Sequence, residues 1–220
     1  LLNSVVLVRA LGLEDRGFLV MSLLLPSILI TFSDFGIAAA GTKFAASERS
    51  LASTVFVTNS WVACLRILLL GALGILIINF YGDLFFIGIP KIFLYLGLLQ
   101  VVGTAIQGWI FPIFLALGKG IRYGLILLGS SVFGLLAFVV AWLTIGLSVK
   151  LALLLTIGSN LIVAVYIYFN VRSHIGEIGK FSKQYLKKAL SFGSGIYVSQ
   201  VCIFVNDKVV LLILNFSLIL

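Results

Sequence analysis

Four charged side chains interrupt long apolar stretches of this sequence: Asp34, Arg66, Asp207 and Lys208. An ionisable group at bilayer depth costs at least ~2.5–3.5 kcal/mol on insertion scales, so it normally faces protein groups or water. Arg66 lies midway along its stretch, where it either holds an anionic group in a hydrated cavity or pairs with an internal aspartate. Asp34 lies near the end of its stretch and is either functional, an interfacial anchor or a helix cap. Asp207 and Lys208 are adjacent, so at most one of them faces a cavity.

Uncharged polar residues form seams on the same stretches, because residues three, four or seven apart share one face of a helix. The seams are Ser27, Thr31 and Asp34; Asn59, Ala63 and Arg66; Gln100, Gly103, Thr104 and Gln107; and Gln200 with Asp207, beside Ser199 and Asn206. Seams on several helices favour a hydrated central cavity, for which the candidate lining residues are Arg66, Asn59, Gln100, Gln107 and Gln200. The alternative is that these groups only hydrogen-bond to neighbouring helices.

The sequence lacks the residues that enzyme chemistry needs. His174 is the only histidine, and no cluster of Cys, His and carboxylate residues has metal-ligand spacing. No GxxxxGK[ST] loop is present to bind nucleotide phosphates. The one acidic pair, Glu14-Asp15, falls in a short loop. The sequence therefore predicts no enzyme activity, no cofactor and no metal site.

The elements that position these residues must be membrane helices. Of the 220 residues, 62% are hydrophobic and 10% are charged, whereas soluble domains have about 45–50% apolar and about 25% charged residues. The mean hydropathy is +1.26. The formal net charge of +8 comes from basic residues between the apolar runs, where they record orientation, so we expect no nucleic-acid partner. The predicted fold class is an all-α polytopic membrane helix bundle.

Apolar runs of about 20 residues predict the spanning helices. Leu1–Val8 is the tail of a truncated first helix, and a polar hinge follows at 9–16. The other predicted spans are 17–40, 54–80, 91–117, a fifth that follows Arg122 and runs through Trp142, 150–168, and a seventh that starts near Phe192. This predicts an N-terminal lobe over 1–170, a basic linker over 171–190 and the start of a second lobe over 191–220. A chain without an initial Met that stops inside an apolar run is expected to be a fragment.

The loop charges predict an orientation. The loops after the second, fourth and sixth helices hold nine Lys and Arg residues, and the loops after the first, third and fifth hold four. Positive charge favours the cytoplasmic side, so the first set and the N-terminus are predicted to be cytoplasmic. In the linker, Ile178, Phe181 and Tyr185 recur at spacings of three and four among lysines, which is typical of a basic amphipathic segment on an anionic leaflet. The alternative is a solvated linker.

Three ordered motifs resemble a known family. Residues 9–17, RALGLEDRG, resemble the first hinge of the polysaccharide flippase family of the MOP exporter superfamily. Residues 33–38, SDFGIA, are similar to the SDLGL of that family near the end of its second helix. Residues 190–193, LSFG, and 206–208, NDK, resemble the LRFG start of its seventh helix and a later acidic residue. The resemblance covers the whole chain, with two departures: Leu13 and Gly195 stand where the family often has proline.

The resemblance implies the first six-helix lobe of a two-lobed transporter plus the first helix of its second lobe, working by alternating access. The implied substrate is a polyprenyl-pyrophosphate-linked oligosaccharide, flipped across the bacterial inner membrane for polysaccharide or O-antigen biosynthesis. Membrane lipids and the polysaccharide polymerase and glycosyltransferase machinery are the other implied partners. Arg66 would suit the pyrophosphate, and Asp34 or Asp207 would carry a coupling proton. The alternatives are a MATE-like multidrug or cation antiporter, a peptidoglycan lipid-precursor flippase and a non-transporting scaffold.

Overall fold

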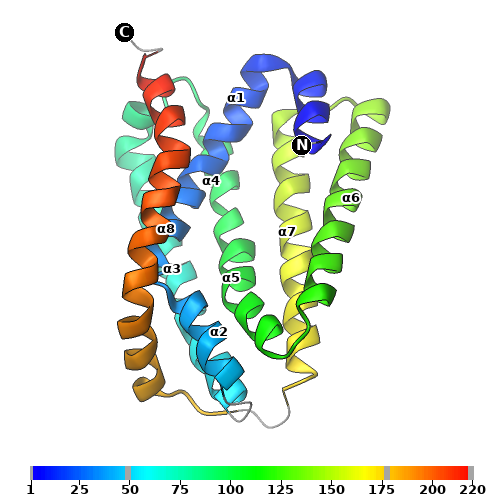
Figure 1. The fold of residues 1–220 in the computed structure, drawn as a ribbon. Coiled ribbons are helices and arrows are strands. Elements are labelled where there is room, and N and C mark those ends of the chain that lie inside the picture. Colours follow the sequence, from blue (N-terminus) through cyan, green and yellow to red (C-terminus); the bar gives the residue numbers. More distant parts are fainter. Residues whose placement is uncertain (1, 48–50, 176–178, 218–220) are drawn as a thin grey trace.

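The computed structural model describes residues 2–47, 51–175 and 179–217, and the side chains within 6–47, 51–175 and 179–206. The secondary structure of these residues is α-helical, and the helices pack side by side in one elongated bundle (Figure 1). The helices are α1 (Leu2–Ser33), α2 (Ile37–Ser47), α3 (Ala52–Phe85), α4 (Lys91–Leu98), α5 (Gln100–Ala116), α6 (Gly120–Thr144), α7 (Val149–Arg172) and α8 (Lys183–Ser217). This confirms the predicted all-α polytopic bundle.

Six stretches of the described residues are long and apolar enough to cross a membrane. They are Val6–Ser33, Ala52–Phe85, Lys91–Ala116, Gly120–Thr144, Val149–Arg172 and Lys183–Asn206. Their outer faces carry large apolar side chains such as Leu68, Phe133 and Leu143, which are 66%, 62% and 75% exposed. Such faces require lipid as their surroundings, because contact between this much apolar surface and water is energetically unfavourable.

α1 contains a sharp kink at Gly12, whose φ of 79° and ψ of 178° are not helical. A residue with a side chain adopts this conformation only under strain, so glycine fits the position. The short leg before the kink packs Leu7 and Ala10 against a buried cluster that includes Leu19 and Leu153. The predicted hinge over 9–16 is therefore narrower than expected, since the residues on both sides of Gly12 are helical.

A second break corrects the prediction of one continuous helix over 17–40. α1 ends at Ser33 and α2 starts at Ile37, and between them Phe35 and Gly36 have left-handed φ values of 48° and 70°. The amide of Asp34 bonds to the carbonyl of Thr31 instead of continuing the α-helical pattern. Lys43, which was predicted to lie in a loop, belongs to α2.

Other boundaries also differ from the prediction. α3 continues beyond the predicted end of its span at residue 80 and ends at Phe85, and the predicted span over 91–117 is divided at Leu99 into α4 and α5. The linker is shorter than predicted, because α7 extends to Arg172 and α8 already starts at Lys183. Apolar runs mark where a helix is stable in lipid, whereas its ends depend on capping contacts with the neighbouring chain.

α5 lies at the centre of the bundle (Figure 1), where it contacts α2, α3 and α7. Ile110, Ile113 and Phe114 of α5 are fully buried, and Trp109 is 5% exposed. They pack into one apolar cluster with side chains of α2, α3, α7 and the start of α8, including Phe56, which stacks edge-on with Trp109 at 5.1 Å. This cluster fixes α5 and thereby the polar residues that α5 carries.

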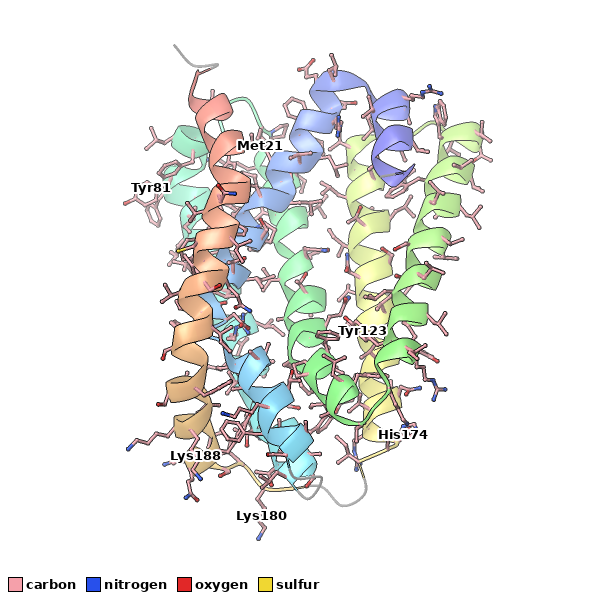
Figure 2. The ribbon with its side chains drawn as sticks, viewed as in Figure 1. Met21, Tyr81, Tyr123, His174, Lys180 and Lys188 are labelled. Carbon is pink, nitrogen blue, oxygen red and sulfur yellow. The ribbon has the colours of Figure 1, made fainter. Side chains whose placement is uncertain are left out.

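The connections alternate between the two ends of the bundle, as the loop order predicts. α2, α5 and α7 end, and α3, α6 and α8 begin, at one end of the bundle, whereas α3 and α6 end at the other, where α1 bends (Figure 1). Figure 2 places Lys180, Lys188 and His174 at the first end. These three residues therefore lie on the same side of the membrane.

Candidate functional site

Two grooves whose linings mix polar and apolar side chains lie along α1. The first, the α1–α7 groove, has a volume of about 440 Å³ and lies among α1, α5, α6 and α7. The second, the α1–α5 groove, has a volume of about 450 Å³ and lies between α1 and α5. Val20 and Leu23 line both, so the grooves adjoin along one face of α1. Their polar lining residues are Arg16, Gln107, Ser130, Ser131, Thr156, Ser159 and Asn160 in the first, and Ser27, Thr31, Gln100 and Thr104 in the second.

One stripe of α1 forms a wall of both grooves. Arg16, Val20, Leu23, Ser27 and Thr31 follow each other at spacings of four, three, four and four, and each of them lines a groove. The hydroxyls of Ser27 and Thr31 donate to the carbonyls of Leu24 and Ser27, at 2.7 and 2.9 Å. Their oxygen lone pairs are left to accept from a ligand. The predicted seam of Ser27 and Thr31 thus faces a groove.

α5 and α7 meet through amide side chains on the groove wall. The Gln107 Nε2 donates to the backbone carbonyl of Asn160 at 2.9 Å and to the Asn160 Oδ1 at 3.2 Å. The close approach depends on Gly103, because an added Cβ would lie 3.3–3.4 Å from three atoms of Asn160. Gln107 therefore combines the two predicted roles: it lines a groove, and it also bonds to a neighbouring helix.

Gln100 is the second amide that α5 contributes to the grooves. Its Oε1 is buried and has no hydrogen-bond partner, and its backbone carbonyl accepts from the Thr104 hydroxyl at 2.9 Å. An unpaired buried oxygen is costly, so it favours a ligand donor or water at this point. Of the predicted cavity residues, Gln100 and Gln107 are the two that the structure places on a groove.

Arg66 lies apart from both grooves and binds the end of α1. Its Nη1 lies 3.3 Å from the Asp34 Oδ1, and the two side chains are 14% and 19% exposed. The guanidinium also donates to the Ser33 Oγ at 2.9 Å and to the Ile30 carbonyl at 3.1 Å. The Ile30 carbonyl is available because the helix breaks at Asp34. The structure thus has the internal salt bridge, and it identifies Asp34 as the partner of Arg66.

The break between α1 and α2 is covered by α8. Gly193 lies so close that a Cβ added to it would approach the Phe35 carbonyl oxygen to 2.6 Å and the Gly36 carbonyl oxygen to 2.7 Å. The Tyr197 hydroxyl donates to the Phe32 carbonyl at 2.8 Å, and its ring lies 5.2 Å from that of Phe35. We call the contacts of residues 30–36 with Arg66, Gly193 and Tyr197 the α1–α8 junction. It gives the Phe32 carbonyl a donor at the helix break, and it adds the Arg66 guanidinium to the Ser33 hydroxyl as a second donor to the Ile30 carbonyl.

Asn59 was predicted to line a cavity, but the structure buries it elsewhere. Asn59 is 1% exposed and its Oδ1 accepts from the Tyr185 hydroxyl at 3.1 Å. Its neighbour Thr58 accepts from the Ser182 amide at 3.1 Å. Tyr185, for which the linker pattern left a position on a lipid leaflet and a solvated position open, is therefore an anchor of α8 on α3. The Lys183 and Lys187 side chains beside it remain exposed.

Gln200 is the one predicted site residue of α8 whose side chain the structure describes. Gln200 is exposed on α8 and lines neither groove. Asp207 and Lys208 belong to the helix, but their side chains lie outside the described residues. Ile178 of the amphipathic pattern also lies outside them.

Sequence reasoning missed several groove residues, chiefly Arg16 and Asn160. Arg16 was counted as a loop charge, although its spacing to Ser27 and Thr31 continues their stripe. The run Thr156, Ser159, Asn160 has helical spacing and carried the same signal as the Gln100–Gln107 seam. Within the part of the chain that the structure describes, no hydrogen bond or ion pair engages the Arg16 side chain. No group of three His, Cys, Asp or Glu side chains there could hold a metal.

The comparisons with known proteins found no match. No protein-family model matches it. No curated protein and no solved structure matches it either.

Proposed function

We propose that this chain is the N-terminal lobe of a transporter that flips polyprenyl-pyrophosphate-linked oligosaccharides across the bacterial inner membrane, for polysaccharide or O-antigen biosynthesis. The observation that carries the proposal is the lining of the two α1 grooves, in which amides, hydroxyls and one guanidinium face a space of about 440 and about 450 Å³. A site for one drug-sized ligand has a volume of ~300–1,000 Å³, and each groove falls in this range. Two adjoining grooves of this size suit a ligand of several sugar rings. The motifs that resemble the polysaccharide flippase family support the same reading.

The groove chemistry fits the head of such a substrate. The Ser and Thr hydroxyls offer acceptors to sugar hydroxyls, and amide nitrogens offer donors. Arg16 is the one cation on the lining, and it has no protein partner among the described residues. A guanidinium binds phosphate oxygens through two parallel, charge-assisted hydrogen bonds. We therefore assign the role of pyrophosphate ligand to Arg16, whereas the family resemblance had suggested Arg66.

The lining disfavours the cation antiporter. A site for cationic drugs needs carboxylates, because a buried cation must be paired. No Asp or Glu lines either groove among the described residues. Asp34, which follows the last residue of α1 and was predicted to carry a coupling proton, is paired with Arg66.

A second lobe, implied by the family resemblance, would close the grooves on their open side. The α1–α8 junction ties α8 to the end of α1, the helix that forms the groove wall. Movement of α8 with a second lobe would therefore act on α1, which is how rocking of the lobes would open the grooves to either side.

A flipping assay tests the proposal. The transporter that contains this chain is reconstituted in proteoliposomes with a fluorescent polyprenyl-pyrophosphate sugar, and the fraction of label that crosses is measured by an impermeant quencher. We expect Arg16→Gln to lower the rate at least tenfold and Arg16→Lys to lower it less, since lysine keeps the charge but loses the bidentate geometry. Arg122→Gln, at the start of α6 and outside both grooves, is the matched control and should retain the wild-type rate.

Two results would overturn the proposal. One is full activity of Arg16→Gln. The other is transport of a cationic dye such as ethidium by proteoliposomes that do not move the sugar lipid, which would establish the antiporter.

The proposed orientation places the end with Lys180 and Lys188 in the cytoplasm, because that end carries the larger basic set. A single cysteine introduced at Lys180 in a variant without Cys64 and Cys202 should resist an impermeant maleimide in intact cells and react after the inner membrane is opened. Ready labelling of intact cells would reverse the topology.

A further inference from the structure

A third groove lies on the seam between α6 and α7, and it is apolar. It has a volume of about 250 Å³ and is lined by Ile126, Gly129, Phe133, Ile162 and Tyr166, together with three residues that it shares with the α1–α7 groove. Phe133 and Ile162 are 62% and 63% exposed, so the groove opens on the outer surface of the bundle. No atom lies within 4 Å of a Cβ added to Gly129. The glycine therefore leaves space in the groove that a side chain at this position would fill.

The apolar α6–α7 groove and the polar α1–α7 groove meet at Ser130, Ser159 and Val163, which line both. On α6, residues 127, 131 and 134 face the polar groove, and 126, 129 and 133 face the apolar one, with Ser130 at the boundary. α7 repeats this arrangement, with Ser159 and Val163 at the boundary. The two grooves are therefore the inner and outer sides of one seam between two helices.

The boundary of this seam presents small and satisfied groups. The Ser130 hydroxyl donates to the Leu127 carbonyl at 2.8 Å, and the Ser159 hydroxyl donates to the Thr156 carbonyl at 2.9 Å. Since both donors are used within their own helices, an apolar chain beside the two serines would leave no donor unpaired.

The seam lies near the middle of the bilayer. Ser130 is ten residues from the first residue of α6, Gly120, which is ~15 Å along the helix at ~1.5 Å per residue. The hydrocarbon core is ~30 Å thick. A lipid that keeps its head at the membrane surface has no polar group at this depth. A lipid whose head occupies the polar groove must lead its tail out sideways at this depth.

We propose that the α6–α7 groove is the docking site for the isoprenoid tail of the transported lipid, with its head held in the α1–α7 groove on the other side of the seam. This inference rests on the proposed function and names the place where the tail leaves the bundle. The occupant is a polyprenyl chain rather than a bilayer acyl chain, because the groove adjoins a polar site at mid-depth that only a translocating head group requires. Phe133 and Tyr166 flank the chain with flat apolar surfaces.

Photo-crosslinking tests the assignment. The chain in nanodiscs is exposed to polyprenyl phosphate that carries a diazirine near the phosphate end of its tail, and cross-linked peptides are identified by mass spectrometry. We expect labelling concentrated on the segments that contain Phe133 and Tyr166. Gly129→Leu fills the groove and should reduce this labelling at least fivefold. Gly124→Leu is the matched control: it is a glycine of the same helix with no atom within 4 Å of an added Cβ, it lines none of the three grooves, and its labelling should be unchanged.

A diacyl phospholipid that carries the same diazirine is the control that distinguishes a tail site from ordinary lipid contact. Equal labelling of Phe133 and Tyr166 by both probes, or labelling that Gly129→Leu does not alter, would overturn the inference.

Failure of this inference is distinct from failure of the proposed function. If Gly129→Leu flips the substrate at the wild-type rate and cross-links appear on other helices, the transporter stands and the tail site falls. If the tail labels this groove but no head group crosses in the flipping assay, the tail site stands and the transport proposal falls.

Discussion

Two guanidinium groups lie along α1 in opposite surroundings. Arg16 belongs to α1, and Arg66, which belongs to α3, contacts the C-terminal end of α1. Arg66 reaches from α3 to the end of α1 and bonds to Ser33, Asp34 and the Ile30 carbonyl. Arg16 lines an open groove and has no partner among the described residues. A paired charge stabilises the packing of two helices, whereas an unpaired charge at a groove is available to a ligand. The α1–α8 junction is therefore structural, and the α1 grooves are the candidate binding site.

The two regions differ in packing as well. At the junction, Gly36 and Gly193 bring two backbones into contact, so that neither can carry a Cβ. In the α1–α7 groove, Gly134 has no atom within 4 Å of an added Cβ. The same residue type thus marks a tight contact in one region and open space in the other. This difference makes the comparison testable by substitutions of the same size.

The largest effect is expected from breaking the charge pair of the junction. Arg66→Met leaves the Asp34 carboxylate without its partner, which should cost ~3–5 kcal/mol of unfolding free energy for a pair this buried. The measurement is thermal unfolding of the purified chain in detergent. The double variant Arg66→Met/Asp34→Leu should recover most of the loss, because no unpaired charge remains. A single variant as stable as the wild type would contradict the structural role.

The next effect is expected from adding one carbon to the glycine contact. Gly193→Ala places a Cβ 2.6–2.7 Å from the backbone of Phe35 and Gly36, and such overpacking costs ~1–3 kcal/mol. Protease sensitivity of the α7–α8 linker should rise, since α8 is held less firmly. Gly195→Ala, two residues away on the same helix and with no atom within 4 Å of its Cβ, is the control and should behave like the wild type. Equal effects in both variants would show that α8 does not pack closely on the break.

A smaller effect on stability is expected in the groove. Gln107→Leu removes hydrogen bonds to Asn160, and interhelical hydrogen bonds in membrane proteins average ~0.6 kcal/mol. Flipping, in contrast, should fall severalfold, because the groove loses an amide. Unfolding and flipping of the same preparation are compared. A loss of stability as large as that of Arg66→Met would place Gln107 with the structural residues instead.

The smallest effect should have the opposite sign. Gly134→Ala in the groove wall should raise the unfolding free energy by roughly 0.5 kcal/mol, since alanine is favoured over glycine inside a helix and nothing obstructs its Cβ. Thermal unfolding beside the wild type measures the shift. Destabilisation would mean that the groove is closed at this point.

Much of the fold could be predicted from the sequence. The apolar runs gave the spanning helices and the alternation of the connections between two ends, and Gly12 lay inside the predicted hinge. The break at Asp34–Gly36 was missed, although the glycine was visible, because an apolar run continues on both sides of it. Helix boundaries near Ser33, Leu99 and Lys183 depend on contacts made by other helices, and the sequence does not list those contacts.

The candidate site was less predictable. Gln100 and Gln107 were found from their spacing, whereas Arg16 was taken for a loop charge and Asn59 for a cavity residue. In a soluble protein, polarity separates the buried face of a helix from the exposed one. In a membrane protein, lipid and the bundle interior are both apolar, so a helix pattern does not say which face meets which neighbour.

The sequence by itself determined that this chain is a membrane helix bundle, that charged residues within its spans must be paired or hydrated, and that several helices carry polar seams. Only the tertiary structure decided which seams meet. It paired Arg66 with Asp34 across 32 positions of sequence, buried Asn59 beneath Tyr185, and left Arg16 facing a groove. The physical reason is that hydration and hydrogen-bonding costs require each polar group in the membrane to find a partner or a cavity, whereas the choice between them depends on how the helices pack.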